Sequence, residues 1–241
     1  MNICSYSKKC NDLINILKLN NQKQIIKWQI LNSRNIQNLV INYIGFTPKT
    51  KEELKEAINL WCSNKEEAIK KYGDINTWNV HNITDMSNLF EYCELFDQNL
   101  SNWDLSSATE LYDFFKYCYA FNNGNMPLTW TIGNYKDASG TTINMNQMFH
   151  SCISFNQDVS SWETESVVDM NAVFYNCETF NQDISNWNTK NVTDMTNMFA
   201  FCVLLDQCPE TELGPDGQID ELWNGWNTSN VTSFYQMFYG C

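Results

Sequence analysis

The cysteines are the side chains in this chain best suited to chemistry. The 241 residues include 10 Cys but only 2 His. Cysteine thiolates can attack electrophiles or bind zinc, and paired cysteines form disulfides. No C-x-x-C pair occurs, and neither His81 nor His150 lies in a recognisable motif, so we expect no zinc site. No sequence pattern of a hydrolase nucleophile, a phosphate-binding loop or a dinucleotide-binding loop is present, which predicts a protein that is not an enzyme and uses no cofactor.

Six cysteines share one position in a recurring pattern, M-x-x-(M/L/F)-F-x-x-C. A free cysteine behaves as a small hydrophobic residue, so this regularity favours a ladder of buried thiols over a disulfide framework. Adjacent units would still bring the sulfurs within bridging distance, and oxidation in pairs therefore stays open. The Phe and Cys anchors predicted to form the core are Phe90, Cys93, Phe115, Cys118, Phe149, Cys152, Phe174, Cys177, Phe199 and Cys202; the pattern itself recurs once more, at Phe238 and Cys241.

Three recurring aspartates, Asp158, Asp183 and Asp194, raise the question of calcium, which prefers oxygen ligands. These aspartates do not recur in every unit, because the first unit has Asp97 and Asn99 in a different arrangement. The acidic segment 216–220 also lacks the spacing of an EF-hand loop. We therefore expect solvated carboxylates and no metal site.

The elements that position these residues follow from the spacing of the pattern. Successive pattern phenylalanines are 25, 34, 25, 25 and 39 residues apart, which is a 25-residue repeat with two insertions. A unit of this length cannot bury its own apolar face and must stack on its neighbours. The sequence thus predicts an α/β fold, a right-handed, leucine-rich-repeat-like solenoid of strand, turn and helix.

The unit ending at Cys202 shows the pattern most clearly. Met195, Met198, Phe199 and Cys202 have the i, i+3, i+4, i+7 spacing of one helix face, with Thr193 or Asp194 as N-cap. The segment 183–187, ending in Trp187, is expected to be a short strand. An Asn or Asp recurs at one further position and is expected to hydrogen-bond turn backbone in the adjacent unit. These residues are Asp97, Asn122, Asn156, Asn181 and Asp206.

Aromatic residues also occupy positions between those of the apolar stripe, where core packing does not require them. Exposed aromatic side chains are typical of protein interfaces. Partial packing against adjacent helices explains them equally well. The candidate binding residues are Tyr92, Tyr112, Tyr117, Tyr175, Phe201, Tyr235 and Tyr239.

The charge is divided unevenly along the chain. Residues 1–72 hold 12 Lys/Arg and 6 Asp/Glu, a net of +6, whereas residues 73–241 hold 3 and 22, a net of −19, which gives −13 in total. An array with this much negative charge repels phosphate backbones, and we therefore expect no nucleic-acid partner. The basic part, residues 1–72, either docks on the acidic array, which is the favoured interpretation, or attracts another acidic surface.

There is no apolar run long enough for a membrane span and no visible signal peptide, which slightly favours the cytoplasm over the cell surface.

Three regions are expected: an N-terminal helical region over 1–46, a helical cap over 47–72, and the repeat array over 73–241 with insertions near 122–141 and 203–225. In the cap, Thr50 and Glu53 have capping-box spacing ahead of an apolar face, and a second helix is expected from near Ser63 to Gly73. A small recruitment module, such as an F-box-like adaptor, is the alternative for the N-terminal part.

The unit F-N-Q-D-I-S-x-W-x-T-x-N-V-T-D-M-x-x-M-F-x-x-C resembles the BspA-like repeat family, also called DUF285. The resemblance covers about residues 73–241 together with the lead-in from Lys51 to Ile75. It implies a leucine-rich-repeat-like solenoid with surface or interaction roles and no transferable chemistry. The secretion signal and lipid-anchor cysteine box common in bacterial members are not seen here.

These observations predict a scaffold that binds another protein. A structural or adhesive component of a cell surface or virion is one alternative, and an adaptor with an N-terminal recruitment module is another. The chain stops at Cys241, one apolar stripe into a unit, so the last unit is expected either to continue in a longer protein or to associate end to end with another molecule.

Overall fold

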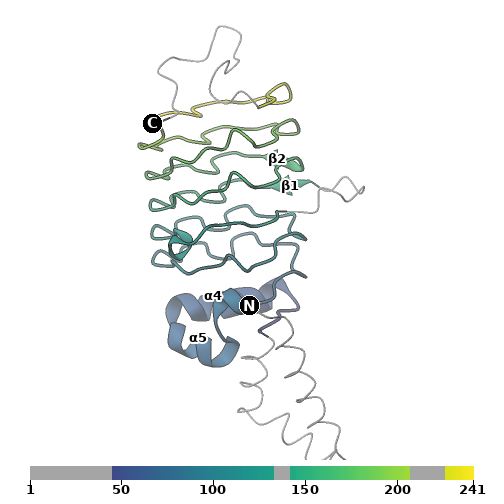
Figure 1. The fold of residues 1–241 in the computed structure, drawn as a ribbon, viewed down its shortest axis with the longest axis vertical. Coiled ribbons are helices and arrows are strands. Elements are labelled where there is room, and N and C mark those ends of the chain that lie inside the picture. The colour runs from purple at the N-terminus through teal and green to yellow at the C-terminus, as the bar shows by residue number, and fades with distance from the viewer. Residues whose placement is uncertain (1–44, 133–141, 207–225) are drawn as a thin grey trace, which may run out of the picture. The chain divides into compact units, whose positions relative to one another are not determined.

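The computed structural model describes residues 45–132, 142–206 and 226–241. The N-terminal region predicted over 1–46 lies almost wholly outside these residues, as do 133–141 and 207–225 of the two insertions. Residues Gly45–Cys241 form one compact unit. Within it, two helices lie at one end of a stack of irregular coils (Figure 1).

The helices of the cap follow from local sequence signals. Helix α4 spans Lys51–Ser63, and the Thr50 side chain accepts a hydrogen bond from the Glu53 N–H at its start. Its apolar face, Leu54, Ala57, Ile58 and Trp61, is buried as the spacing predicted. Helix α5 spans Lys65–Tyr72 and ends at Gly73, but its N-cap is Asn64, because the Asn64 side chain and not that of Ser63 accepts the Glu67 N–H.

The remaining elements in the described residues are short. They are two 3₁₀ turns, η1 over Ile75–Thr77 and η2 over Asn123–Asn125, and two strands, β1 over Ile143–Asn144 and β2 over Val167–Asp169. The strands pair in parallel, with Ile143 opposite Val167. Isolated parallel bridges continue this pairing on both sides, from Asp85 to Glu110 and from Asp194 to Ser233 among others. The parallel pairing therefore lies just before each apolar stripe.

The predicted helix in each unit was wrong for the described residues. The apolar stripes, residues 86–93, 111–118, 145–152, 170–177, 195–202 and 234–241, are termed turn segments below. Each consists of consecutive turns, in which the Met198 N–H bonds to Met195 O and the Cys202 N–H to Phe199 O. Backbone φ is positive at Asn197 and Phe201, which a helix does not allow. Two four-residue turns place the first, fourth, fifth and eighth side chains on one side, so they reproduce the apolar spacing of a helix.

The predicted strand that ends at each Trp was also wrong. Trp187 N–H bonds to Ile184 O and Asp183 accepts the Ser185 N–H, so this segment is a turn. The tryptophan itself is buried, and its indole N–H donates to the carbonyl of Val159 in the preceding unit at 3.0 Å. Indoles of Trp103, Trp130 and Trp162 make the corresponding bond. A buried indole N–H needs such a partner, and the stack supplies it to these four tryptophans.

Backbone hydrogen bonds join the units through the turn segments. Alternate residues donate to the next unit, as Met195, Asn197, Phe199 and Phe201 do to the carbonyls of Ser233, Tyr235, Met237 and Tyr239 at 2.7–3.0 Å. The same four bonds recur at all five junctions between the six turn segments. Within a turn segment the N–H groups thus face the C-terminal neighbour, and the carbonyls that bond across the junctions face the N-terminal one.

The predicted side-chain ladder is confirmed. Asn156 Oδ1 accepts the backbone N–H of Asn181 at 2.9 Å, and Asn122 accepts that of Asn156 at 3.0 Å. The bonds at Asp97 and Asn181 continue the series. Each side chain thereby satisfies a backbone donor one unit further along.

The core is a column of stacked aromatic rings. Phe149 stacks on Phe115 at 5.6 Å and on Phe174 at 5.8 Å between ring centroids. The pattern phenylalanines from Phe90 to Phe199 are fully buried, as are Cys118, Cys152, Cys177 and Cys202, whereas Cys93 is partly buried. Ring contacts thus connect the core of each unit with that of the next.

We expect Phe174→Ala to lower the free energy of unfolding by about 3–5 kcal/mol, because it removes a buried ring from the middle of this column. Urea unfolding followed by circular dichroism measures the change. Tyr235→Ala, which truncates an aromatic side chain that is 66% exposed, is the control and should change stability little. A loss below about 1 kcal/mol for Phe174→Ala would show that the column is not the core.

Candidate interaction surface and cysteine ladder

One row of aromatic side chains crosses all six units on the surface. Its members, termed the aromatic stripe, are Tyr92, Tyr117, His150, Tyr175, Phe201 and Tyr239. Neighbours are in ring contact throughout, with centroid distances of 5.0, 5.2, 4.5, 5.4 and 5.3 Å in that order. The row follows the last residues of the turn segments, so the stacking of the units aligns it.

The structure therefore brings together five of the seven aromatic residues predicted from the sequence. Tyr92 and Tyr239 are well exposed, at 64% and 56%, and the middle of the stripe is half-buried. Tyr112 and Tyr235 lie near the other end of their turn segments, and the described residues show no ring contact between them and the stripe. His150 was missed because sequence reasoning considered it only as a metal ligand, although it occupies the same place in its unit as Tyr175 and Tyr239.

Two units also carry exposed apolar residues shortly after their cysteine. Leu95 and Leu204 occupy the same place, two residues after the cysteine, in the first and fifth units, and they are 90% and 56% exposed. Val203 is also exposed.

The one titratable imidazole in the stripe, His150, is uncharged because it is partly buried. Lys116 pairs with Asp113 at 3.1 Å and lies 5.6 Å from the centre of the Tyr117 ring. Burial, helped by the Lys116 charge, lowers the pKa of His150 to about 4. The Ser151 hydroxyl lies 3.0 Å from its Nδ1. His150 is therefore neutral at physiological pH and contributes to the stripe as an aromatic ring.

The cysteine ladder is buried, and its thiols bond to backbone. Each S–H donates to the carbonyl of the pattern phenylalanine in the preceding unit, as Cys177 does to Phe149 at 3.0 Å and Cys202 to Phe174 at 3.0 Å. Burial raises the pKa of Cys202 to about 12 and raises the pKa values of Cys118, Cys152 and Cys177 as well. A nucleophile needs an accessible thiolate, so these four thiols serve packing.

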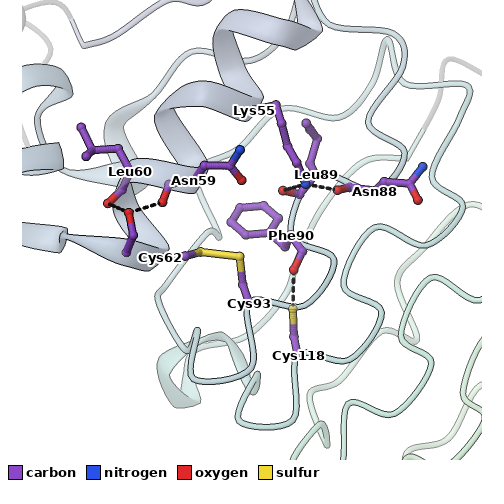
Figure 2. The surroundings of a disulfide bond; sticks show 10 residues. Lys55, Asn59, Leu60, Cys62, Asn88, Leu89, Phe90, Cys93 and Cys118 are labelled. Atoms are coloured by element: carbon purple, nitrogen blue, oxygen red, sulfur yellow. Dashed lines mark hydrogen bonds between the residues drawn. A yellow bond between two sulfur atoms is a disulfide. The ribbon is translucent and has the colours of Figure 1, made fainter.

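The first cysteine of the ladder differs from these four thiols. Cys93 forms a disulfide with Cys62 of helix α4, with Cα atoms 5.9 Å apart (Figure 2). The pairing thus joins the cap to the first unit, and not two adjacent units as the sequence left open. Its signal in the sequence was weak, since Cys62 lies outside the recurring pattern.

Lysines of the cap reinforce this attachment. Lys51 pairs with Asp85 at 2.8 Å, and Lys55 donates to the carbonyl oxygens of Asn88 and Leu89. Burial lowers the pKa of Lys55. Figure 2 shows Lys55 reaching from α4 to these two carbonyls. The sequence predicted that the basic residues 1–72 dock on the acidic array. Within the described residues of that region, Lys51 and Lys55 of the cap make such contacts.

The aspartates considered for calcium hold local turns. Asp158 and Asp183 accept the N–H of Ser160 and Ser185, and Asp194 accepts that of Thr196 at 2.8 Å. These bonds lower the pKa of Asp158 and Asp183. No cluster of three or more potential metal-binding side chains occurs in the described part of the chain.

The stacked units, the buried thiols and the aromatic surface stripe indicate a repeat protein but do not identify its family. Comparison with family models is more specific: the family described as "Mycoplasma protein of unknown function, DUF285" matches residues 54–141, 131–209 and 216–241. The chain belongs to this family, as its motif indicated. Neither the curated proteins nor the solved structures gave a match. Among the helices described here, none is long and apolar enough to cross a membrane.

We expect stability to depend on pH through His150. Because its pKa is lower in the folded than in the unfolded chain, the folded state binds fewer protons between about pH 6.5 and pH 4. The stability contributed by neutral His150 is therefore complete above this range and lost as the pH falls through it. His150→Phe keeps a ring but cannot titrate, so its thermal midpoint should rise relative to the unmodified chain between pH 7 and pH 4. A difference that stays constant over this range would contradict the prediction.

The four ladder thiols should resist labelling in the native protein. We expect iodoacetamide to modify Cys118, Cys152, Cys177 and Cys202 only after denaturation, because they are buried and protonated. Without a reductant, Cys62 and Cys93 should stay linked even in denaturant. Peptide mass mapping reads both results, and Cys62→Ser is the control that leaves Cys93 open to labelling. Rapid native labelling of the four thiols would refute their burial.

Proposed function

We propose that this chain is a right-handed solenoid that acts as a non-enzymatic scaffold and binds another protein through its aromatic stripe. The observation that carries the proposal is the unbroken ring contact from Tyr92 to Tyr239 across six units. Rings fixed by their neighbours lose little conformational entropy on binding. Aromatic residues are also the side chains that contribute most often to interface energy.

The chemistry of the surface constrains the partner. Glu94 precedes the exposed Leu95, the carbonyl of Glu178 accepts the N–H of the exposed Leu204, and residues 73–241 have a net charge of −19. Complementary charge speeds association and excludes acidic competitors. We therefore expect a partner surface with apolar groups at its centre and basic residues around them.

A surface component is the second candidate, and the Cys62–Cys93 disulfide favours it. Disulfides persist in oxidising compartments and are rare in the cytosol. The adaptor alternative rests on the N-terminal part, of which α4 and α5 are described. Both helices belong to the compact unit Gly45–Cys241, and the buried face of α4 is used in its core.

Matched variants test the scaffold proposal. The double variant Tyr175→Ser and Phe201→Ser breaks the stripe in the middle, and Tyr235→Ser removes an exposed aromatic residue outside it. In affinity capture from the native cell, a specific partner should be lost with the double variant and kept with Tyr235→Ser. Retention by both variants would rule out the stripe, and adhesion to cells or glycans without a protein partner would favour the surface component.

A further inference from the structure

The aromatic stripe advances by one ring per unit, and the length of that step selects the kind of polypeptide that can follow it. The centroids of neighbouring rings are 4.5–5.4 Å apart from Tyr92 to Tyr239. An α-helix repeats at every turn of about 5.4 Å. Side chains on one face of an extended strand are about 6.8 Å apart, and those on one face of a polyproline II helix about 9.3 Å. Of these three conformations, only the α-helix offers one side chain to each unit.

Carboxylates beside the stripe specify the charge of such a helix. Glu94 follows Tyr92 by two residues and Glu178 follows Tyr175 by three. Neither glutamate makes an ion pair with another of the described residues. Lys116, which lies against the stripe, is already paired with its neighbour in the same turn segment. Lys and Arg on a partner helix therefore meet unpaired carboxylates, whereas acidic residues are repelled.

The two glutamates also set the spacing of those basic residues. Glu94 and Glu178 occupy the same place, directly after the cysteine, in the first and fourth units, so three steps of the stripe separate them. Three turns of an α-helix cover about 16 Å, or about 11 residues. Two basic residues about 11 positions apart, on the flank of one apolar face, thus match both carboxylates.

We propose that the aromatic stripe binds a basic amphipathic α-helix of the partner, which lies along the stack with one turn on each unit. This inference rests on the proposed function and adds the conformation and the charge of the bound segment. The apolar residues of the helix, at i, i+4, i+7 and i+11, contact the rings, as the apolar faces of helices do in other complexes. Covering the stripe from Tyr92 to Tyr239 takes about five turns, or about 18 residues.

The probe is a synthetic, fluorescently labelled peptide of about 18 residues with leucine at these apolar positions and lysine on both flanks. Its matched control has the same sequence with two central residues replaced by their D-enantiomers, which keeps composition and charge but disfavours the right-handed helix. Fluorescence anisotropy should give a Kd at least about tenfold lower for the helical peptide than for the control. Circular dichroism should show that the helical peptide gains helix when it binds.

Variants of the chain locate the bound helix. The double variant Tyr175→Ser and Phe201→Ser should lose the peptide, and Tyr235→Ser should keep it. Glu178→Gln leaves every ring in place and should weaken binding about two- to fivefold, a loss that disappears at high salt. Glu66→Gln, which removes an exposed carboxylate of α5, should have no effect. Thermal midpoints measured alongside show whether each variant is folded, and Glu178→Gln tests the site even if the double variant is not.

Three results would overturn the proposal: equal binding of the two peptides, binding of the helical peptide by the folded double variant, or equal binding by Glu178→Gln and Glu66→Gln at low salt. Tighter binding of a proline-rich peptide to the stripe would replace the helix with a polyproline II segment and reject the proposal as well. If the double variant still loses the native partner in affinity capture, the scaffold proposal stands although the helix is rejected.

Discussion

Backbone hydrogen bonding between units is the constraint on which the rest of this structure depends. A turn segment has positive φ at two of its eight residues, which turns half of its N–H groups away from its own carbonyls and toward the next unit. Such a conformation leaves polar groups unpaired in an isolated unit, and an unpaired buried group costs about 1–3 kcal/mol. Stacking removes that cost. The phenylalanine column, the thiol-to-carbonyl bonds and the Asn ladder all keep the same register.

The same constraint explains the attachment of the cap and the surface of the array. Because the backbone bonds between turn segments point one way, the first segment presents carbonyls toward the cap, and Lys55 donates to one of them, Leu89 O. Because the register repeats, aromatic residues at nearly equivalent positions come into contact without any interaction of their own to bring them together. The aromatic stripe is thus a consequence of stacking.

The sequence predicted the parts of this structure that depend on side-chain type. The buried phenylalanines and thiols, helix α4 with its Thr50 cap, and the ladder through Asn156 all follow from apolar spacing and hydrogen-bonding capacity. The helix predicted for 195–202 failed because consecutive turns share its i, i+3, i+4, i+7 pattern. Only φ distinguishes them, and an aromatic residue at positive φ, such as Phe201, is uncommon enough that sequence alone does not suggest it. The Cys62–Cys93 pair was hidden because tertiary packing of the cap, not spacing, brings it together.

Scalar couplings across hydrogen bonds test the central claim most directly, since they identify donor and acceptor in solution. In a long-range HNCO spectrum, the amides of Asn197 and Phe201 should couple to the carbonyl carbons of Tyr235 and Tyr239, about 40 residues away in the chain. Couplings from Phe199 and Phe201 to carbonyls four residues earlier would instead establish the helix and contradict the account.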